Sequence, residues 1–323
     1  KYTVTGVLMD RDAGIPIYKD AETKEPVTAT ATFTAESENG TADVEFTFDA
    51  SLYEGVTVVA FEDLYYNGVK VGTHSDLSDE EQAVHIVKIG TTATDKFTMD
   101  HVLKHGKTEI IDTVSYKGLV PGTEYVLSAT LMDKETGKPY SDKSVSEIKF
   151  TPNASEGKVE VSFTFDTDKL DGKTLVVFEK LYFEGINIAN HEDIKDEGQT
   201  LYIPKIGTSA SDSKTKESIM LAEEEAKLID TVKYENLLPD REYVIIGQLV
   251  RKSDGSAVEI YDGLTKKELP VADATMSDAT ATDATMSDAT NTDAQPRAVG
   301  QYVIKKFVPD TSEGSVDITF RFD

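Results

Sequence analysis

Residues 159–165 read Val-Glu-Val-Ser-Phe-Thr-Phe, so that an apolar side chain stands at every second position. Because successive side chains of a β-strand point to opposite faces, this alternation gives the segment one apolar and one polar face. Similar short segments recur along the chain, separated by Gly, Pro, Asp and Asn, and no stretch shows a sustained helical period. The sequence therefore predicts an all-β fold of tandem immunoglobulin-like antiparallel β-sandwich domains.

The chain repeats itself at a fixed spacing. Residues 58–66 return at 176–183 with Glu62 matched to Glu179, and 179 − 62 = 117. The same spacing relates His74 to His191, Gln82 to Gln199, and Lys-Ile-Gly-Thr at 88–91 to its copy at 205–208. Several shared motifs at one spacing are the sequence signature of tandem repeats.

These motifs divide the chain into one complete repeat, residues 88–205, between two partial repeats. Residues 1–87 lack the first strands of the repeat, and residues 206–323 lack its last strands. We expect the sequence to be a window onto a longer array. Neighbouring repeats follow one another without a Pro- or Ser-rich linker, so we expect them to abut and form an elongated rod.

Residues 272–295 depart from this pattern. They repeat Ala, Asp, Thr, Met and Ser and hold few apolar side chains, so they cannot bury enough surface to order themselves. We interpret the segment as a solvated insertion in a strand-connecting loop of the third repeat. A loop that carries a glycan or contacts a ligand is the alternative.

Composition argues against several classes of function. Lys and Arg total 33 against 59 Asp and Glu, a net charge of −26, which disfavours nucleic acid and acidic membrane surfaces as partners. The absence of Cys removes disulfides, thiolate nucleophiles and Cys-ligated zinc. No apolar run approaches the ~18 residues that a membrane span needs. We expect no cofactor, no metal and no membrane insertion in this segment.

Two repeats carry the same polar motif after an apolar strand. It reads His-x4-Asp-x2-Gln at 74–82 and again at 191–199. The strand before it ends in Val-Ala-Phe-Glu at Glu62 and in Val-Val-Phe-Glu at Glu179. A carboxyl group at such a place is costly to bury unless it has a partner. The repeated spacing favours a shared chemical role over a solvated surface for these residues.

Four motifs together resemble a known family. They are Val-Ala-Phe-Glu at 59–62, the His-x4-Asp-x2-Gln motif, Ile-Gly-Thr at 89–91 and Asp-Thr-Val-x-Tyr at 112–116. As a set they resemble the Thr–Gln ester-bond (VaFE-type) repeat domains of Gram-positive surface adhesins. The resemblance covers the middle repeat fully and the flanking repeats as far as they extend. It implies an Ig-like domain in which an ester joins a Thr of the first strand to a Gln of the last, with release of ammonia.

The resemblance also implies a role for particular residues of the middle repeat. Thr91 would be the nucleophile, Gln199 the acceptor and His191 the base that transfers the proton. Asp112 and Glu179 would be buried acids that assist. The equivalents in the partial repeats are Thr208 and Asp230 in the third, and Glu62, His74 and Gln82 in the first.

The implied reaction is chemically sound. A Thr hydroxyl is a poor nucleophile until a base takes its proton, and an amide nitrogen leaves only when it is protonated. Histidine can perform both transfers near neutral pH. A carboxyl group kept protonated by burial can donate a hydrogen bond to the amide oxygen. A fold that holds the two groups together supplies effective molarities of ~10⁵–10⁸ M.

Several assignments have alternatives at this stage. Thr113 competes with Thr91 as the nucleophile, because both lie near the start of the repeat. Asp112 could be a turn or strand-start residue. Glu179 could be half exposed and paired with Lys180. The His and Gln residues of the motif could be ordinary solvated side chains at strand ends.

The remaining histidines and acidic residues suggest no second site. His85, His101 and His105 have no counterparts in other repeats, so we interpret them as surface residues. Asp76 and Asp79, with Asp193 and Asp196, could suggest a calcium loop, but they lack the Asp-x-Asn-x-Asp-Gly pattern.

We expect the protein to be a structural stalk on the bacterial cell surface, attached to the cell wall, and not an enzyme with turnover. Its expected partners are neighbouring repeats of the same chain and a host ligand bound by parts outside this segment. The alternatives are a ligand-binding adhesin module without cross-links and a hydrolase that uses Thr or Ser with His. A stalk with Lys–Asn isopeptide bonds is a further rival. Lys88 and Lys205 lie near the first strand, but the closing motif offers Gln where Asn is needed.

Overall fold

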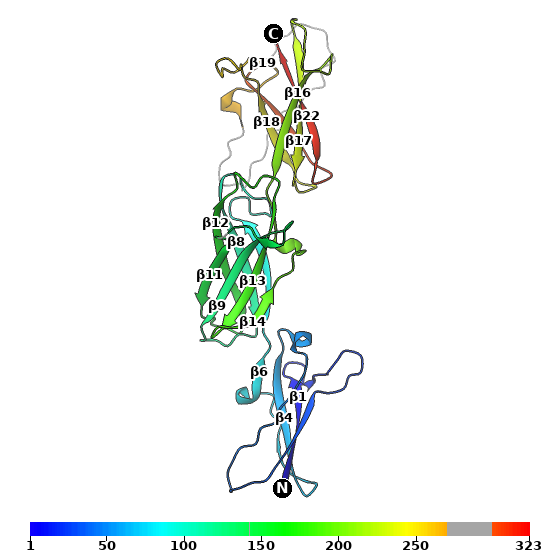
Figure 1. Ribbon diagram of the computed structural model, residues 1–323, viewed down its shortest axis with the longest axis vertical. Helices are drawn as coiled ribbons and strands as arrows, with labels where there is room; N and C mark the ends of the chain where they lie inside the picture. Colours follow the sequence, from blue (N-terminus) through cyan, green and yellow to red (C-terminus); the bar gives the residue numbers. More distant parts are fainter. Residues whose placement is uncertain (142, 270–298) are drawn as a thin grey trace. The chain divides into compact units, whose positions relative to one another are not determined.

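The computed structural model of the chain describes residues 1–141, 143–269 and 299–323, and these are folded mainly into β-strands (Figure 1). The insertion expected at 272–295 lies outside the described residues. Among the described residues, no helix is long and apolar enough to cross a membrane. The helices are single 3-10 turns, namely η1 (Ala50–Tyr53), η2 (Glu80–Gln82), η3 (Glu197–Gln199) and η4 (Lys266–Glu268). The all-β fold predicted from the period-two pattern is confirmed.

Close contacts divide the chain into two compact units, which we describe separately. The first unit holds residues 1–93, 110–163 and 176–200, and the second holds 94–109, 164–175 and 201–323.

The first unit begins with the partial first repeat, which forms one sheet. Its strands are β1 (Tyr2–Asp10), β2 (Ile15–Pro16), β3 (Thr28–Phe33), β4 (Thr57–Tyr66), β5 (Val69–His74) and β6 (Ala83–His85). They pair in the order β2-β1-β4-β5, with β3 also on β1 and β6 also on β4. Leu8, Ile17, Val27 and Val58 form its core.

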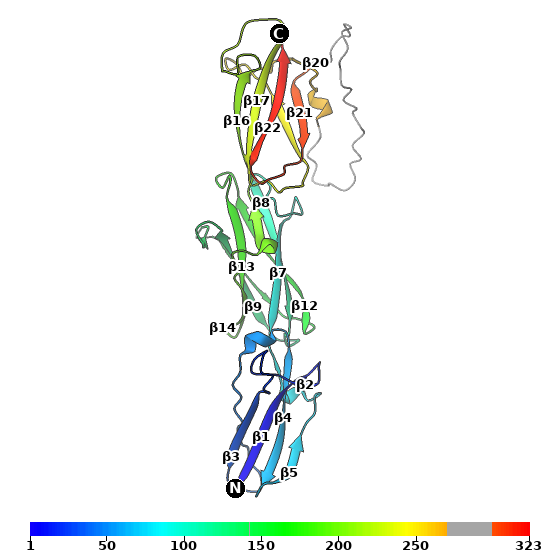
Figure 2. The ribbon, with the colours of Figure 1, turned by 90° about the vertical axis from the view of Figure 1, so that its right-hand side faces the viewer.

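The middle repeat holds two sheets. The first runs in the order β12-β8-β7, and β7 lies at its edge (Figure 2). The second runs in the order β10-β9-β13-β14, with β11 also on β9 and β15 also on β13. Their bounds are β7 (Lys88–Asp95), β8 (Lys107–Lys117), β9 (Tyr125–Asp133), β10 (Lys138–Pro139), β11 (Val145–Phe150), β12 (Glu156–Asp166), β13 (Thr174–Phe183), β14 (Ile186–His191) and β15 (Thr200–Tyr202). The rings of Tyr116 in β8 and Phe150 in β11 lie 5.7 Å apart, so the two sheets face each other.

The partial third repeat belongs to the second unit. Its main sheet has the order β16-β17-β22 (Figure 2), and smaller sheets pair β18 with β21 and β19 with β20. The bounds are β16 (Lys205–Asp212), β17 (Ala226–Glu235), β18 (Tyr243–Gln248), β19 (Ile260–Tyr261), β20 (Val299–Gly300), β21 (Tyr302–Phe307) and β22 (Gly314–Phe322). Val232, Ile260, Ile318 and Phe320 form its core.

Strand alternation explains why polar residues enter the core of the middle repeat. In β8 every second residue from Thr108 to Tyr116 is buried, and Asp112 is one of them. In β13 the buried face carries Glu179 between Val177 and Leu181. Because the period of a strand is two, these carboxyl groups cannot leave the core without turning their apolar neighbours outward.

Candidate functional site

Four polar side chains from separate segments of the first unit lie together between the two sheets of the middle repeat. They are Thr91 of β7, Asp112 of β8, Glu179 of β13 and Gln199 of η3. Asp112, Glu179 and Gln199 are each 0% exposed. The hydroxyl oxygen of Thr91 is buried as well. Polar groups without exposure are unusual in a small sandwich and call for a physical explanation.

The strand pattern directs Thr91 inward. It alternates with the buried residues Ile89 and Ala93, so it lies on the core face of β7, while its neighbour Thr92 is exposed. Thr113 follows Asp112 in β8 and therefore points to the opposite face of that sheet. The geometry thus places Thr91, and not Thr113, beside the buried acids.

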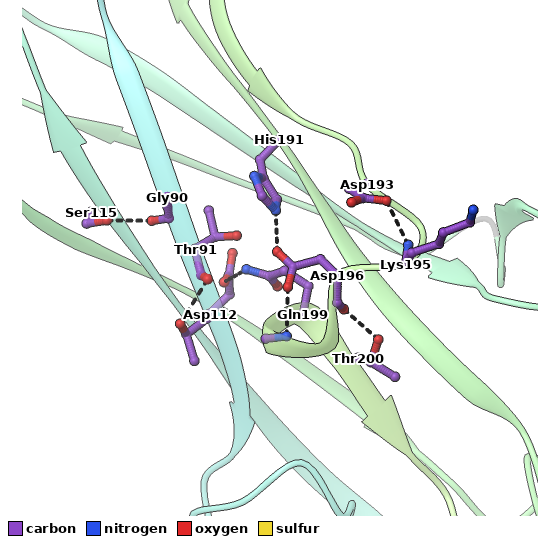
Figure 3. A network of polar contacts seen from close by, with 12 residues as sticks. Gly90, Thr91, Asp112, Ser115, His191, Asp193, Lys195, Asp196, Gln199 and Thr200 are labelled. Atoms are coloured by element: carbon purple, nitrogen blue, oxygen red, sulfur yellow. Dashed lines mark hydrogen bonds and ion pairs between the residues drawn. The ribbon is translucent and has the colours of Figure 1, made fainter. Parts of the chain in front are cut away.

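A short turn carries Gln199 into the core. Asp196 is the N-cap of η3, and its Oδ1 accepts a hydrogen bond of 2.7 Å from the backbone N–H of Gly198. Thr200 Oγ1 donates to the backbone oxygen of Asp196 at 2.6 Å. The side-chain Nε2 of Gln199 donates to Asp112 Oδ1 at 3.2 Å, as Figure 3 shows. Gln199 therefore lies in the turn just before the last strand, β15, and not in that strand as the resemblance implied.

The same four residues leave polar atoms without partners. Among the described residues, six buried side-chain atoms have no hydrogen-bond partner. Five of these are Thr91 Oγ1, Asp112 Oδ2, both carboxyl oxygens of Glu179, and Gln199 Oε1. A buried polar atom without a partner costs free energy, so a cluster of them in one place points to chemistry and not to stability.

Burial also controls the charge of the two acids. It raises the pKa of Glu179 to about 10, and the nearby charge of Asp112 adds to the rise. Burial raises the pKa of Asp112 too, an effect partly offset by the nearness of the Glu179 carboxyl and by the hydrogen bond from Gln199. The Thr91 hydroxyl lies close enough to lower the pKa of Glu179 somewhat, although no hydrogen bond of normal geometry joins them. At neutral pH the pair therefore keeps a proton.

His191 reaches this cluster across the sheet. It is the register partner of Glu179 in the antiparallel pair β13–β14, so the two side chains lie on the same face. Its Nε2 lies 2.6 Å from Asp196 Oδ2 (Figure 3). We assign Nε2 as the nitrogen that carries the proton, because it faces a carboxylate, which leaves Nδ1 as the basic nitrogen.

Asp196 is a site residue that the sequence reasoning did not select. It orients His191 through Oδ2 and shapes the Gln199 turn through Oδ1. A signal was present, because Asp79 and Asp196 share the repeat spacing, 196 − 79 = 117. Both residues are the Asp of the His-x4-Asp-x2-Gln motif.

The arrangement can join Thr91 to Gln199. A hydroxyl, a carboxamide, a proton-holding acid pair and an imidazole surround one buried place. These are the groups that acyl transfer from an amide to an alcohol requires. The alternative interpretation of Glu179 as an exposed partner of Lys180 is wrong, because Glu179 is fully buried and Lys180 pairs with Glu192 at 3.0 Å. Asp112 lies within strand β8 and is not a turn residue.

A model of the family described as "T-Q ester bond containing domain" matches residues 1–86, 87–203 and 204–323. The chain belongs to this family. Two solved structures of a bacterial adhesin from Mobiluncus mulieris, described as containing intramolecular disulfide, isopeptide and ester bond cross-links, are similar to it. They are 14% and 15% identical, with TM-scores of 0.32 and 0.32, over 53% and 52% of this chain and 91% and 91% of theirs. No curated protein matches the sequence.

The first T-Q domain holds the closing half of the constellation. Glu62 and His74 are register partners, and His74 Nε2 lies 2.8 Å from Asp79 Oδ2, as in the middle domain. Burial raises the pKa of Glu62. Glu62 and His74 line an open groove of about 530 Å³ on the β1-β4-β5 face. Gln82 ends η2 and is half-buried. This domain has no strand corresponding to β7 among its described residues.

The third T-Q domain holds the opening half. Thr208 of β16 is exposed, and Asp230 of β17 lies opposite Ala210. Burial raises the pKa of Asp230, as it does for Asp112. Within the described part of the chain, only the middle T-Q domain brings together one Thr, one Gln, one His and two buried acids, namely Thr91, Gln199, His191, Asp112 and Glu179.

The other residues considered from sequence take no part in this site. His105 is exposed as expected, but the surface interpretation is wrong for His85 and His101, which are half-buried. His85 contacts the hydroxyl of Thr57 at 2.9 Å. Lys88 and Lys205, the candidates for an isopeptide, are both exposed.

The acidic residues of the supposed calcium loop cap turns instead. Asp76 accepts from Ser78 N at 2.8 Å, and Asp193 accepts from Lys195 N at 2.9 Å. The described residues hold no group of three or more His, Cys, Asp or Glu side chains that could bind a metal ion.

Proposed function

We propose that the middle T-Q domain forms an ester between Thr91 and Gln199 once, after folding. The observation that carries this proposal is the cluster of five unpartnered buried polar atoms on Thr91, Asp112, Glu179 and Gln199. Each is an atom that takes part in the reaction or lies beside it. Burying these atoms costs free energy. The domain retains them because the folded chain must hold the reacting groups together before they react.

In this reaction Thr91 Oγ1 forms a bond with the side-chain carbonyl carbon of Gln199. The bond from that carbon to Nε2 breaks. His191, held by Asp196, takes the hydroxyl proton and returns a proton to the departing nitrogen, which leaves as ammonia. The protonated carboxyl of the Asp112–Glu179 pair donates a hydrogen bond to the developing oxyanion on Gln199 Oε1. A hydroxyl and a carboxamide thus become an ester and ammonia with no other reactant.

The ester would serve a mechanical function. Thr91 lies in the edge strand of one sheet, and Gln199 precedes β15 of the other, so the bond ties the two sheets together near both ends of the domain's chain. A pull along the chain would then pass through a covalent bond instead of through strand pairing. A chain without Cys gains in this way what disulfides give to other extracellular proteins.

We therefore propose that the chain is a structural segment of a bacterial cell-surface adhesin, attached to the cell wall, in which each T-Q domain is a load-bearing module. The reaction occurs once per domain, so the protein is not an enzyme with turnover. Its partners in this role are neighbouring domains of the same chain, and ligand binding belongs to other parts of the adhesin. Membership in the T-Q family, the acidic charge and the absence of Cys support this proposal.

Intact-mass measurement of the full chain tests the proposal. The chain should be lighter than its sequence mass by one ammonia, and Gln199→Ala and Thr91→Val should each carry their full sequence mass. Gln82→Ala is the matched control, because Gln82 has the same motif in a domain with no counterpart of Thr91 among the described residues, and it should still lose one ammonia. A wild-type chain at full mass after folding would show that no ester forms.

A further inference from the structure

A basic residue follows the same strand in the first two T-Q domains. Lys134 comes directly after β9, and Arg11 comes directly after β1. Both turns have the same construction. Asp133 Oδ1 accepts from the backbone N–H groups of residues 135 and 136 at 3.0 and 3.0 Å, and Asp10 Oδ1 accepts from those of 12 and 13 at 2.9 and 2.9 Å. The turn therefore holds the basic residue at a fixed place in each domain.

In the middle domain Lys134 reaches the segment that carries Gln199. Its Nζ donates to Thr200 Oγ1 at 3.0 Å and lies 3.9 Å from Glu197 Oε1. Thr200 is 0% exposed, whereas the Glu197 side chain is 78% exposed. The contact with Thr200 is therefore the stronger of the two, because a charged donor gains more from a partner that water does not reach.

Thr200 connects Lys134 to the residues that hold the reactive groups. Its hydroxyl donates to the backbone oxygen of Asp196, and Asp196 in turn binds both His191 and the backbone of Gly198. One chain of hydrogen bonds thus runs from Lys134 to the imidazole and to the turn that ends in Gln199. None of these contacts touches Thr91 or the carboxamide carbon, so Lys134 acts on the reaction only through position.

The first domain has an equivalent contact, but it forms without a threonine hydroxyl. Both terminal nitrogens of Arg11 bind the Glu80 carboxylate, with Nη1 at 3.2 Å from Oε2. Glu80 occupies the position of Glu197, since 197 − 80 = 117, and Ala83 stands where the middle domain has Thr200. Without a hydroxyl at Ala83, the longer fork of Arg binds the turn directly. Two different solutions for the same contact indicate that the contact itself is what the domain needs.

We propose that Lys134 is a positioning residue for ester formation, a clamp that holds the η3 turn so that Gln199 faces Thr91 and His191 keeps its orientation. This inference rests on the proposed ester. A loosened turn would let the carboxamide swing away from the hydroxyl, and small misplacements of reacting groups cost up to about a hundredfold in rate.

The experiment follows the reaction in the full chain during cell-free synthesis. The background carries Gln82→Ala and Thr208→Ala, so that only the middle domain can react. Samples are quenched at intervals and weighed, and the fraction lighter by one ammonia is compared with the fraction resistant to protease, which reports folding. Three variants are compared with the background: Lys134→Met, Lys134→Arg and Thr200→Val. Lys149→Met is the matched control, because Lys149 forms an exposed ion pair with Glu124 at 2.9 Å in the same domain.

We expect Lys134→Met and Thr200→Val to slow ammonia loss from folded chains roughly tenfold or more. Lys134→Arg should restore most of the rate, because Arg11 fills the same place, and Lys149→Met should match the background. Should Lys134→Met fail to become protease-resistant, Thr200→Val decides, since it breaks the same chain of contacts.

Folded Lys134→Met and Thr200→Val that react at the background rate would overturn the clamp while leaving the ester intact. A background chain that folds and keeps its full mass would instead remove the ester, and the clamp with it. The two failures are therefore distinguishable in one experiment.

Discussion

Asp112 and Glu179 bring two fully buried carboxyl groups, one from each sheet, into mutual contact at the centre of the middle domain. Two such groups cannot both ionise at close range without water, so one holds a proton at neutral pH. A carboxylic acid that stays neutral is a hydrogen-bond donor, which an ionised carboxylate is not. The pair therefore supplies an acid where the Gln199 carbonyl needs one.

Glu179→Gln tests the need for this acid. The amide keeps the size and the hydrogen-bonding capacity of the side chain, but it is a much weaker acid. We expect ester formation to slow by roughly 10²–10⁴-fold, the usual contribution of a positioned proton donor. Intact mass followed over time measures the effect. Glu62→Gln in the first domain is the control and should leave the rate unchanged, since Glu62 lies outside the reacting domain.

The same pair predicts how stability depends on pH before the bond forms. Thr91→Val blocks the ester and keeps the buried acids. The pKa of Glu179 is raised in the folded chain, so the folded domain holds its proton more tightly than the unfolded chain does. Stability is then complete below the unfolded pKa of about 4 and falls as the pH rises toward the folded pKa of about 10.

Denaturant unfolding of Thr91→Val at several pH values measures this slope. Adding Glu179→Gln should reduce it, because the more strongly shifted of the two buried acids is gone. A Thr91→Val chain whose middle domain is as stable at pH ~9 as at pH ~5 would contradict the raised pKa.

Asp196→Asn separates the two roles of Asp196. Asn is as good as Asp at the start of a helical turn, so the η3 turn should keep its shape. The charge opposite His191 is lost, however, and the imidazole loses the partner that fixes its tautomer. We expect ester formation at neutral pH to slow at least roughly tenfold, with little change in the stability of the Thr91→Val form. Asp79→Asn, which changes the equivalent pair of the first domain, should have no effect on the mass change.

The finished bond should stabilise the middle domain. It closes a loop of 199 − 91 + 1 = 109 residues. A cross-link over about 100 residues contributes about 4–5 kcal/mol in the chain-entropy description. We expect Thr91→Val to lower the free energy of unfolding by about this amount. Protease resistance of fragments from residues 87–203 in rising guanidinium measures it, and Thr208→Val should leave those fragments unchanged.

Much of this site could be predicted from sequence, because its residues obey two periods. The alternation within β8 and β13 requires Asp112 and Glu179 to share a face with Val114 and Leu181, which are buried. The spacing of 117 residues identified His191 and Gln199 by their copies, His74 and Gln82. The periods thus predicted the fold, and the resemblance to the ester-bond family then assigned a role to each candidate residue.

The remaining features depend on contacts that no period encodes. Lys134 and Thr200 lie 66 residues apart, and only the packing of a turn against η3 brings them together. The half-buried position of His85 likewise follows from the pairing of β6 with Thr57 of β4, and the backbone oxygen of His101 accepts from the N–H of the distant Tyr202 at 2.8 Å. Gln199 falls in a helical turn because Asp196 caps it, a local interaction that a strand pattern does not reveal.

The place of Gln199, just before the last strand, has a consequence for how far such a protein can stretch. Thr208, in the first strand of the next domain, follows Gln199 by 208 − 199 = 9 positions. In any array whose domains all close this bond, only the eight residues between this Gln and the next Thr, here 200–207, lie outside a covalent loop in each 117-residue period. Fully drawn out they span about 30 Å. The rest of each period lies inside a covalently closed loop and cannot be extended by tension. The end-to-end length of such an array would therefore change little even where its domains unfold.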